Sequence, residues 1–476
     1  MFARCLPKIM VRLPKSRRRS LLFVRTTLFL GCALALLAQS DQDAQPAQDA
    51  QAPDAQPAPE YGGPAILSRG ETPAMLSPAP IAFRPYIGLS AIFDNGIVPV
   101  SVTPTGQLPS PDVYGVALNL GAYTYRSWKH TTLGVDYRGN FRHYSQQTYY
   151  DGTDQLLALI LTHAPSKRIT FTLRNSAGTY SENYGLPTPP GIVDTNYLQL
   201  PQNDIFYGPV IFLSTAADLT FHKSARLSFD IGGEGDLVRR RSTALYGSTE
   251  GSARADMQYR VTRHSTLGVD YRFTYYSYTK GFGNTDIHSV GLNYSTQLTR
   301  HLQLSARIGG ARVQSLSLAE VQIDPVVAAL LGESVGIQVA HQISYVPDIM
   351  ARLTDTFRRS TFDASYINGI SPGNGVYLAS RSQTETVSYT YTGVRHWNFG
   401  ANAAYARMDA LVQTLSAYSS YGGGIGITRD LGKGLHTVLR LDTRHYDIPG
   451  NQFLRTEYRA TLGLTFSPGD VPLALW

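Results

Sequence analysis

The chain has 476 residues, with 42 Lys and Arg against 35 Asp and Glu, and two cysteines, Cys5 and Cys32. Eight of the basic residues and both cysteines lie in residues 1–38, so the remainder carries 34 basic against 35 acidic residues. This near balance removes the electrostatic argument for a nucleic-acid partner. The lack of thiols beyond residue 38 excludes disulfides, cysteine metal sites and cysteine nucleophiles there.

Residues 1–38 have the pattern of a signal peptide. A basic region that includes Arg17–Arg19 precedes an apolar core, Leu28–Ala38, and Ala38 is a small residue at a plausible cleavage point. An uncleaved membrane helix is the alternative, but the uninterrupted apolar run is well short of the ~20 residues that spanning requires. We therefore expect cleavage after residue 38.

Residues 39–80 are of low complexity. Asp, Ala, Gln and Pro alternate between Asp41 and Pro59, followed by Gly, Pro and Ser among scattered apolar residues. Such a composition cannot bury enough apolar surface to offset its ordering entropy. We predict a disordered periplasmic tail, too short and too polar to be a folded plug.

Residues 81–476 show side chains that alternate between apolar and polar. In Thr132–Arg138 and in Thr266–Arg272, Leu, Val and Tyr take one face, and Thr, Gly, Asp and Arg take the other. A period of two indicates extended strands. We place about 18 strands, with 16 as the alternative. Those we place individually are Val113–Arg126, Thr131–Tyr144, Leu156–Thr162, Arg168–Tyr180, Ala225–Leu237, Ser252–Val261, Ser265–Tyr278, Ser289–Leu298, Leu302–Arg312, Thr361–Asn368, Thr384–Tyr391, Trp397–Tyr405, Tyr421–Thr428, Leu435–Tyr446 and Leu454–Phe466.

Short and long connections alternate along these strands. If both termini lie on one side, such an alternation requires an even number of strands. The short turns are Ser127–His130, Ala164–Lys167, His222–Ser224, Thr262–His264, Thr299–His301, Phe357–Arg359, Val394–His396 and Leu431–Gly434. The longer excursions are Asp94–Asp112, Ser181–Gly208, Val238–Gly251, Gln314–Gly332, Gly369–Arg381 and Arg407–Ser416.

The pattern predicts an all-β fold, an antiparallel transmembrane β-barrel. Only a closed barrel satisfies the backbone hydrogen bonds of strands in a bilayer. A soluble β-sandwich also alternates, but a single domain of this many long strands would be unusually large. Tyrosines at strand ends favour interfacial girdles; the clearest are Tyr125, Tyr144, Tyr278, Tyr366 and Tyr446.

At this point the chain resembles the large bacterial outer-membrane β-barrels, the porin-like superfamily in a broad sense. The best local evidence is the last strand, where Tyr458, Leu462 and Phe466 face one way and Arg459 the other. The resemblance implies a location in the bacterial outer membrane. It also implies recognition of the C-terminal strand by the barrel-assembly machinery, through Phe466 or the terminal Trp476.

The polar faces of the strands predict a charged inner wall, because a charge that faces lipid at mid-bilayer costs roughly 2–4 kcal/mol. Arginine outnumbers carboxylate in the set that we identify. One reading is an ion-pair network that stiffens the wall, and the other is an arginine lining that favours anions. The residues are Asp136, Arg138, Arg142, Arg174, Arg254, Asp256, Asp270, Arg272, Arg307, Arg440, Asp442, Arg444, Arg455, Glu457 and Arg459.

Two segments of the long loops have alternative readings. Val326–Leu331 could form a short helix folded into the barrel or an ordinary surface loop. Arg239–Arg241 could bind lipopolysaccharide phosphates or be solvated.

The resulting prediction is an outer-membrane channel for passive passage of small hydrophilic, in one reading anionic, solutes. The alternative is a structural or surface barrel blocked by its loops, for adhesion or export. The sequence has no His-Glu-x-x-His motif, no phosphate-binding glycine loop and no calcium-loop spacing. Outward His143 and His445 lack a convincing serine partner for lipid hydrolysis, so we expect no enzyme, no cofactor and no metal. The expected partners are membrane lipid, lipopolysaccharide and the solutes; self-association into a homo-oligomer stays open.

Overall fold

The computed structural model describes residues 81–95, 112–145, 151–181, 208–322, 335–411, 416–447 and 454–468. These residues form 18 strands. The strands are β1 Ile81–Asn95, β2 Asp112–Ser127, β3 Thr131–Tyr144, β4 Gly152–Ser166, β5 Ile169–Tyr180, β6 Val210–His222, β7 Leu227–Arg240, β8 Gly247–Arg260, β9 Ser265–Thr279, β10 Asn284–Gln297, β11 Leu302–Gln322, β12 Val335–Thr356, β13 Ser360–Ser371, β14 Ser380–Val394, β15 Trp397–Ala410, β16 Tyr418–Gly432, β17 Leu435–Asp447 and β18 Leu454–Phe466.

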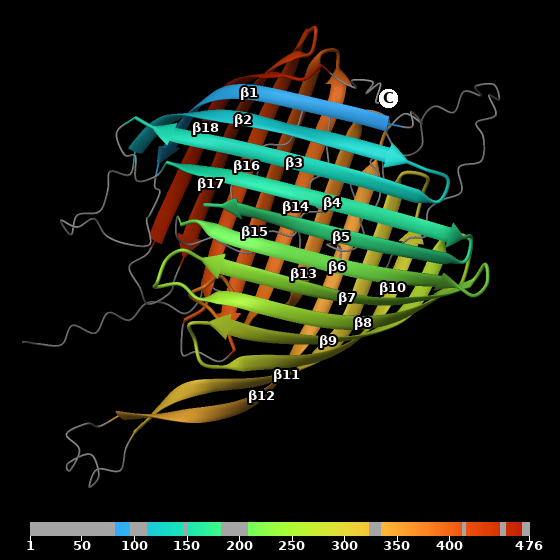
Figure 1. The fold of residues 1–476 in the computed structure, drawn as a ribbon, viewed down its shortest axis with the longest axis vertical. Coiled ribbons are helices and arrows are strands. Elements are labelled where there is room, and N and C mark those ends of the chain that lie inside the picture. The colour runs from blue at the N-terminus through green and yellow to red at the C-terminus, as the bar shows by residue number, and fades with distance from the viewer. Residues whose placement is uncertain are drawn as a thin grey trace, which may run out of the picture. The chain divides into compact units, whose positions relative to one another are not determined.

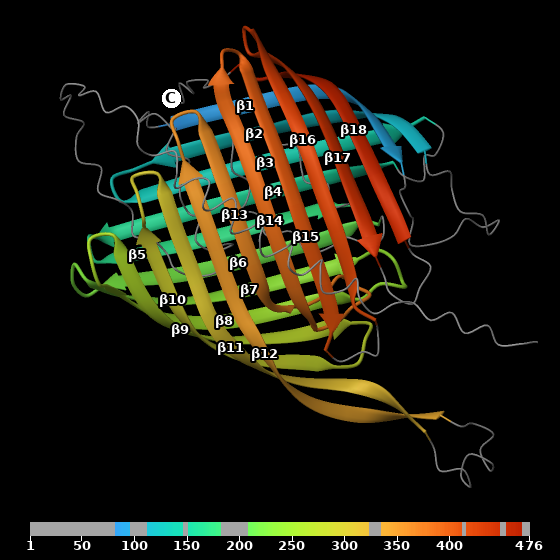
Figure 2. The ribbon, with the colours of Figure 1, turned by 180° about the vertical axis from the view of Figure 1, so that it is seen from behind.

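The sheet is antiparallel and closes on itself. Each strand pairs with the next along the chain, and β1 pairs with β18 from Ile87 opposite Phe466 to Asn95 opposite Tyr458. Figures 1 and 2 show the wall from opposite sides, with β1 to β9 on one side and β13 to β18 on the other. The predicted barrel and its count of 18 strands are confirmed, and the alternative of 16 is wrong.

The two faces of the wall differ as the alternation predicts. On β9, Leu267, Val269 and Tyr271 are exposed outside the barrel, whereas Asp270 is buried on its inner face. On β1, Leu89 is exposed outward. An outer face of this kind suits acyl chains, since transfer of apolar surface out of water is favourable. Among the described residues, no helix is long and apolar enough to cross a membrane.

The predicted short turns all lie at one end of the barrel, and the one comparably short described connection at the opposite end is Lys280–Gly283, between β9 and β10. Between β16 and β17 the chain reverses through Gly432, Lys433 and Gly434, each with positive φ (87°, 54° and 79°). The two central residues of this turn are Lys433 and Gly434. Positive φ at both central residues matches the twist of the flanking strands and so favours a tight hairpin. The end that carries these turns is called the short-turn end below, and the opposite end is the long-loop end.

Three strands were not placed individually from the sequence, namely β1, β6 and β12. In addition, the predicted excursion Gln314–Gly332 is wrong over residues 314–322, because β11 continues to Gln322, and its remaining residues lie outside the described ranges. The alternation there is weak, since Ser shares one face with Val and Ala, and Gln shares the other face with Leu. Val326–Leu331, the signal peptide and the tail lie outside the described residues, and these predictions stay predictions.

The prediction that tyrosines at the strand ends form girdles on the outer face is mostly wrong. Tyr144 and Tyr446 are buried on the inner face, because each lies two residues after an inward arginine and so shares its face. Tyr125 and Tyr278 also lie at inward positions of their strands, and only Tyr366 lies at an outward one. Similarly, Arg240 of the arginine triplet is buried inside the barrel, whereas Arg239 and Arg241 are exposed.

Candidate functional site

The inner wall of the barrel carries the predicted charged residues. On β3, Asp136, Arg138 and Arg142 are buried and alternate with outward apolar residues, and Arg138 is 0% exposed. All the other predicted wall residues also lie at inward strand positions. These are Arg174 on β5, Arg254 and Asp256 on β8, Asp270 and Arg272 on β9, Arg307 on β11, Arg440, Asp442 and Arg444 on β17, and Arg455, Glu457 and Arg459 on β18. The side chain of Arg455 lies outside the described residues.

Most of these arginines pair with a carboxylate. Arg138 Nη2 lies 2.6 Å from Asp136 Oδ2, and Arg440 Nε lies 2.7 Å from Asp442 Oδ2, each within one strand. Arg142 reaches Asp154 of β4 at 2.9 Å. Buried guanidinium groups require such partners, because an unpaired charge away from water is costly. The pairs therefore favour the reading of the wall as an ion-pair network.

The seam between the first and last strands is also closed by charge. Arg459 of β18 forms an ion pair with Asp94 of β1, and the Tyr144 hydroxyl of β3 donates a hydrogen bond to the same carboxylate. Asp94 therefore ties three strands together at the closure of the barrel. Asp94 was not identified from the sequence, since β1 was not placed individually.

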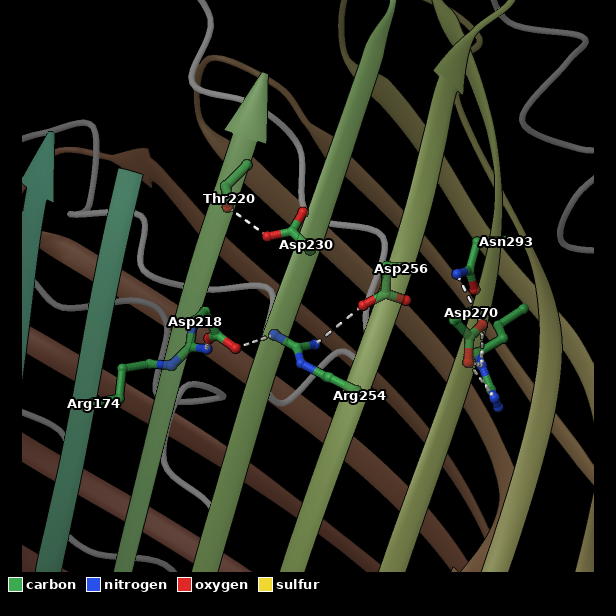
Figure 3. A network of polar contacts seen from close by, with 9 residues as sticks. Arg174, Asp218, Thr220, Asp230, Arg254, Asp256, Asp270 and Asn293 are labelled. Atoms are coloured by element: carbon green, nitrogen blue, oxygen red, sulfur yellow. Dashed lines mark hydrogen bonds and ion pairs between the residues drawn. The ribbon is translucent and has the colours of Figure 1, made fainter. Parts of the chain in front are cut away.

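Part of the network crosses intervening strands, as Figure 3 shows. Asp218 of β6 pairs with Arg174 of β5 and also with Arg254 of β8, beyond β7. The residue of β7 in register with both Asp218 and Arg254 is Gly232. A Cβ at Gly232 would clash with the Asp218 carboxylate and lie 2.8 Å from Arg254 Nε. The missing side chain thus leaves room for the ion pair.

The same arrangement recurs further along the wall. Arg307 of β11 pairs with Asp270 of β9 at 2.7 Å and with Asp348 of β12 at 2.5 Å. Gly291 of β10 lies beneath the first pair, and a Cβ there would lie 2.8 Å from both Asp270 Oδ1 and Arg307 Nε. Asn293 completes the site by donating to Asp270 at 2.9 Å. Glycines on the inner face therefore serve as gaps through which charges meet.

Inward carboxylates are at least as numerous as inward arginines on the described strands, so the predicted arginine excess is wrong. Many of them were missed from the sequence, although the parity of β7 would have indicated Asp230, Glu234 and Asp236. Asp236 of β7 accepts a hydrogen bond from Ser214 of β6 and contacts Glu234 of its own strand. Glu250 of β8 contacts Tyr276 of β9. The inward carboxylates that were missed are Asp94, Asp154, Asp218, Asp230, Glu234, Asp236, Glu250, Asp348 and Asp363.

The two signs of charge are unevenly distributed around the wall. Carboxylates predominate on β6 to β9, where Arg254 and Arg272 face a larger number of Asp and Glu residues. Arginines predominate on the sector of β17, β18, β1, β2 and β3. In a closed sheet of 18 strands, β17 and β18 lie half the circumference away from β8 and β9. The acidic and basic sectors therefore face each other across the interior.

The connection between β13 and β14, Pro372–Ala379, folds toward the interior at the long-loop end. Tyr377 is buried against Met408 and Tyr418, and its hydroxyl donates to the Ser416 carbonyl at 2.6 Å. At the tip, the Gly375 carbonyl accepts from Tyr246 N at 2.9 Å, in the connection between β7 and β8. This loop spans from β15 and β16 to the connection between β7 and β8 on the opposite side of the barrel. The sequence predicted a long excursion here but not that it crosses the interior.

The outward histidines have polar partners of their own. His143 Nδ1 lies 2.7 Å from Asp151 Oδ2, and His445 Nδ1 lies 2.8 Å from Thr456 Oγ1. Over the described ranges, no group of three His, Cys, Asp or Glu side chains is arranged to hold a metal ion.

No protein-family model matches the chain, and no curated protein matches it. Solved structures with a similar fold include Pseudomonas aeruginosa OpdQ (15% identity, TM-score 0.37) and P. aeruginosa OccK2 (OpdF) in complex with glucuronate (13%, 0.40). A BenF-like porin from Pseudomonas fluorescens Pf-5 is similar at 12% identity and a TM-score of 0.39. Each likeness covers 81% of this chain and 98% of the other.

A single chain that closes 18 antiparallel strands, apolar outside and charged inside, cannot expose that outer face to water without a large cost. Its alternating short and long connections are those of barrels inserted from the periplasmic side. The chain thus has the architecture of the porin-like β-barrels of the bacterial outer membrane.

Proposed function

We propose that the protein is a channel for passive passage of small hydrophilic solutes across the outer membrane. The observation that carries this proposal is the inner face of the described strands, which bears charged residues on both sides of the barrel. Barrels of 16 to 18 strands are wide enough to enclose an aqueous path. Purified protein in planar bilayers should give discrete conductance steps, and silence under all tested voltages would refute the channel.

The finer proposal is a preference for anions, supported by the basic sector. Arg440 is 39% exposed toward the interior although it pairs with Asp442, and Arg444 donates to the Tyr446 hydroxyl at 3.3 Å. Guanidinium groups that remain accessible can bind carboxylate or phosphate. The acidic sector opposes this effect, so we expect a modest preference.

Replacing Arg440 and Arg444 by Ser should shift the reversal potential in a salt gradient toward cation selectivity. Arg429→Ser is the matched control, because Arg429 lies outward, with its Cζ 5.1 Å from the centroid of the Trp397 ring. An unchanged reversal potential in the double variant would mean that these two arginines stabilise the wall but do not set the ion selectivity.

A second candidate is a barrel occluded by its loops, with a structural or surface role. The observation in its favour is Pro372–Ala379, which bridges the interior at the long-loop end. If this candidate is right, the native protein is silent in bilayers and conducts only after the loop is loosened. Native conductance would exclude it.

The proposed partners follow from the surfaces. Acyl chains contact the outer apolar face, and Arg239 and Arg241, both exposed at the long-loop end, are positioned for lipopolysaccharide phosphates. The outward row of β18, which includes Leu462, Leu464 and Phe466, is the proposed element for the assembly machinery. Loss of outer-membrane insertion in a Phe466→Ser variant, with normal synthesis and export, would support the last point.

A further inference from the structure

The eight turns at the short-turn end carry charge of one sign. Taken as the residues between the strands that they join, they contain eleven Lys or Arg and no Asp or Glu. Each turn has at least one of these eleven cations, and all eleven are exposed. Within the part of the chain that the structure describes, none of them forms an ion pair. This set of cations is called the basic rim below.

The connections at the long-loop end have a different composition. From residues 96–111 to residues 448–453, their sequences contain two Lys or Arg, namely Arg241 and Lys280, against six Asp or Glu. Exposure to water does not select one sign of charge, because Asp and Glu are found at protein surfaces as readily as Lys and Arg. The exclusive sign of the basic rim therefore calls for a partner of opposite charge.

The described strands do not provide that partner. Within three residues of the eight turns, the described strands contribute two carboxylates, Asp355 and Asp430. Asp430 Oδ2 lies 3.6 Å from His396 Nδ1, and Asp355 is buried beside His301. Both carboxylates thus face histidines rather than a Lys or Arg of the rim.

The cations stand next to apolar side chains at the edge of the outer face. In six of the eight turns an exposed apolar residue lies one or two positions before a Lys or Arg. These residues are Trp128, Val261, Leu298, Phe357, Val394 and Leu431. An apolar side chain beside a cation suits the boundary of a bilayer, where acyl chains meet head groups.

The two tryptophans of the described chain mark the same boundary. Arg126 Cζ lies 4.8 Å from the centroid of the Trp128 ring, and Arg429 Cζ lies 5.1 Å from that of Trp397. Indole rings concentrate at the level of lipid head groups, since one part of the ring is apolar and the other is polar.

We infer that the basic rim binds the anionic head groups of phospholipids in the periplasmic leaflet of the outer membrane. Successive turns along the rim are two strand spacings apart, roughly 10 Å. This distance is close to the Debye length of about 8 Å at physiological ionic strength, so the potentials of neighbouring turns overlap. The leaflet can supply a phosphate beside every turn around the wall, whereas a single folded partner would reach only part of it. Polybasic segments at a membrane surface are attracted to anionic lipids in this way.

This inference rests on the location in the outer membrane and not on channel activity. Silence in planar bilayers would refute the channel and leave the lipid contact untouched. Conversely, a rim without lipid preference would not affect the conductance test.

The rim tryptophans provide a direct readout. Trp128 and Trp397 are two of three tryptophans in the chain, and Trp476→Phe removes the third. This variant, purified from outer membranes, is reconstituted in vesicles of equal parts phosphatidylglycerol and phosphatidylethanolamine. Bromine on the acyl chains of one lipid or the other quenches the fluorescence of the tryptophans that it contacts. We expect roughly twofold enrichment of phosphatidylglycerol at the rim, and high salt should abolish it.

A pair of matched variants assigns the enrichment to the rim. Lys129 follows Trp128 directly, and Arg395 lies two residues before Trp397. In the Trp476→Phe background, Lys129→Gln with Arg395→Gln should bring the two lipids to nearly equal quenching. Arg239→Gln with Arg241→Gln removes the same charge from exposed positions at the long-loop end and should leave the enrichment unchanged. Heat-dependent gel migration verifies that each variant is folded.

Four results would overturn the inference. Equal quenching by the two brominated lipids at low salt would mean that the rim does not select anionic head groups. Enrichment that survives the rim substitutions would place its cause elsewhere in the chain. Loss of enrichment on adding inorganic phosphate at constant ionic strength would indicate binding of free phosphate. Enrichment that appears only after deletion of residues 41–60, which contain five Asp or Glu and no Lys or Arg, would make that segment the occupant.

Discussion

Single glycines decide how charges are paired across the wall. Asp218 and Arg254 lie on strands that are not neighbours, and they meet only because Gly232 has no side chain between them. Removing one partner of a buried ion pair is strongly destabilising, by about 3–5 kcal/mol, and separating Asp218 from Arg254 should cost less, because Asp218 keeps Arg174 as a partner. Gly232 is thus as much a part of the network as the charged residues.

Gly232→Ala should lower the temperature at which the folded form converts to the unfolded form on a denaturing gel. The new Cβ would displace the Asp218 carboxylate from Arg254, leaving both buried without their direct contact. The control is Gly235→Ala on the same strand, where the added Cβ would have no neighbour closer than 3.9 Å. Equal transition temperatures for the two variants would contradict the assigned role.

At the scale of elements, the connection Pro372–Ala379 reaches across the interior at the long-loop end, from β15 and β16 to the connection between β7 and β8. Burial, with a smaller effect from Asp409, raises the pKa of the Tyr377 hydroxyl. The hydroxyl therefore stays protonated at physiological pH and continues to donate to the Ser416 carbonyl. Tyr377 anchors the loop through this bond and through its ring contacts with Met408 and Tyr418.

Tyr377→Ala should release the loop and raise single-channel conductance, or open a channel that is otherwise silent. Increased current noise should accompany the change, since the loop loses its fixed position. Tyr389→Ala on β14 is the control, because Tyr389 is outward and exposed. The same conductance and noise in native protein and the Tyr377 variant would mean that the loop does not lie in the conduction path.

At the scale of the whole molecule, closure depends on the pairing of β1 with β18, which lie at opposite ends of the described chain. Nine register pairs join these strands, and the Arg459–Asp94 ion pair is added to them. A closed sheet has no free edges within the wall, which is why such barrels resist denaturants.

The protein should fractionate with outer membranes and migrate faster on a denaturing gel when it is not heated, because the closed barrel resists unfolding by the detergent. Boiling should shift it to the position of the unfolded chain. Recovery in the soluble fraction, or identical migration with and without heating, would contradict a membrane barrel.

Much of the wall was predictable because alternation is a local property. The inward positions of Asp136, Arg138 and Arg440 follow from residues only one or two positions away. The tyrosine error has the same origin, since Tyr144 should have been assigned to the face of Arg142. The carboxylates of β7 were available to the same reasoning and were overlooked, because Gly233 and Gly235, on either side of Glu234, interrupt the apolar outward face.

The lateral contacts were not predictable in this way. The meeting of Asp218 with Arg254, of Asp270 with Arg307 and of Asp94 with Arg459 depends on the register between strands far apart in sequence. A one-residue slip in register would move every side chain of a strand to the opposite face of the sheet. Likewise, the sequence could not indicate that β12 outruns β13, which pairs with it only over Ile349–Thr356, because strand length relative to a neighbour is a property of the pair.

The sequence by itself determined the class of fold and the sidedness of its wall, because hydrophobic alternation records which side chains meet lipid and which do not. Only the tertiary structure decided between 18 and 16 strands, and only it decided the partners of the buried charges, the balance of charge around the interior and the free edge of β12. These depend on which strands become neighbours and in what register, and that is settled when the sheet closes rather than within any one strand.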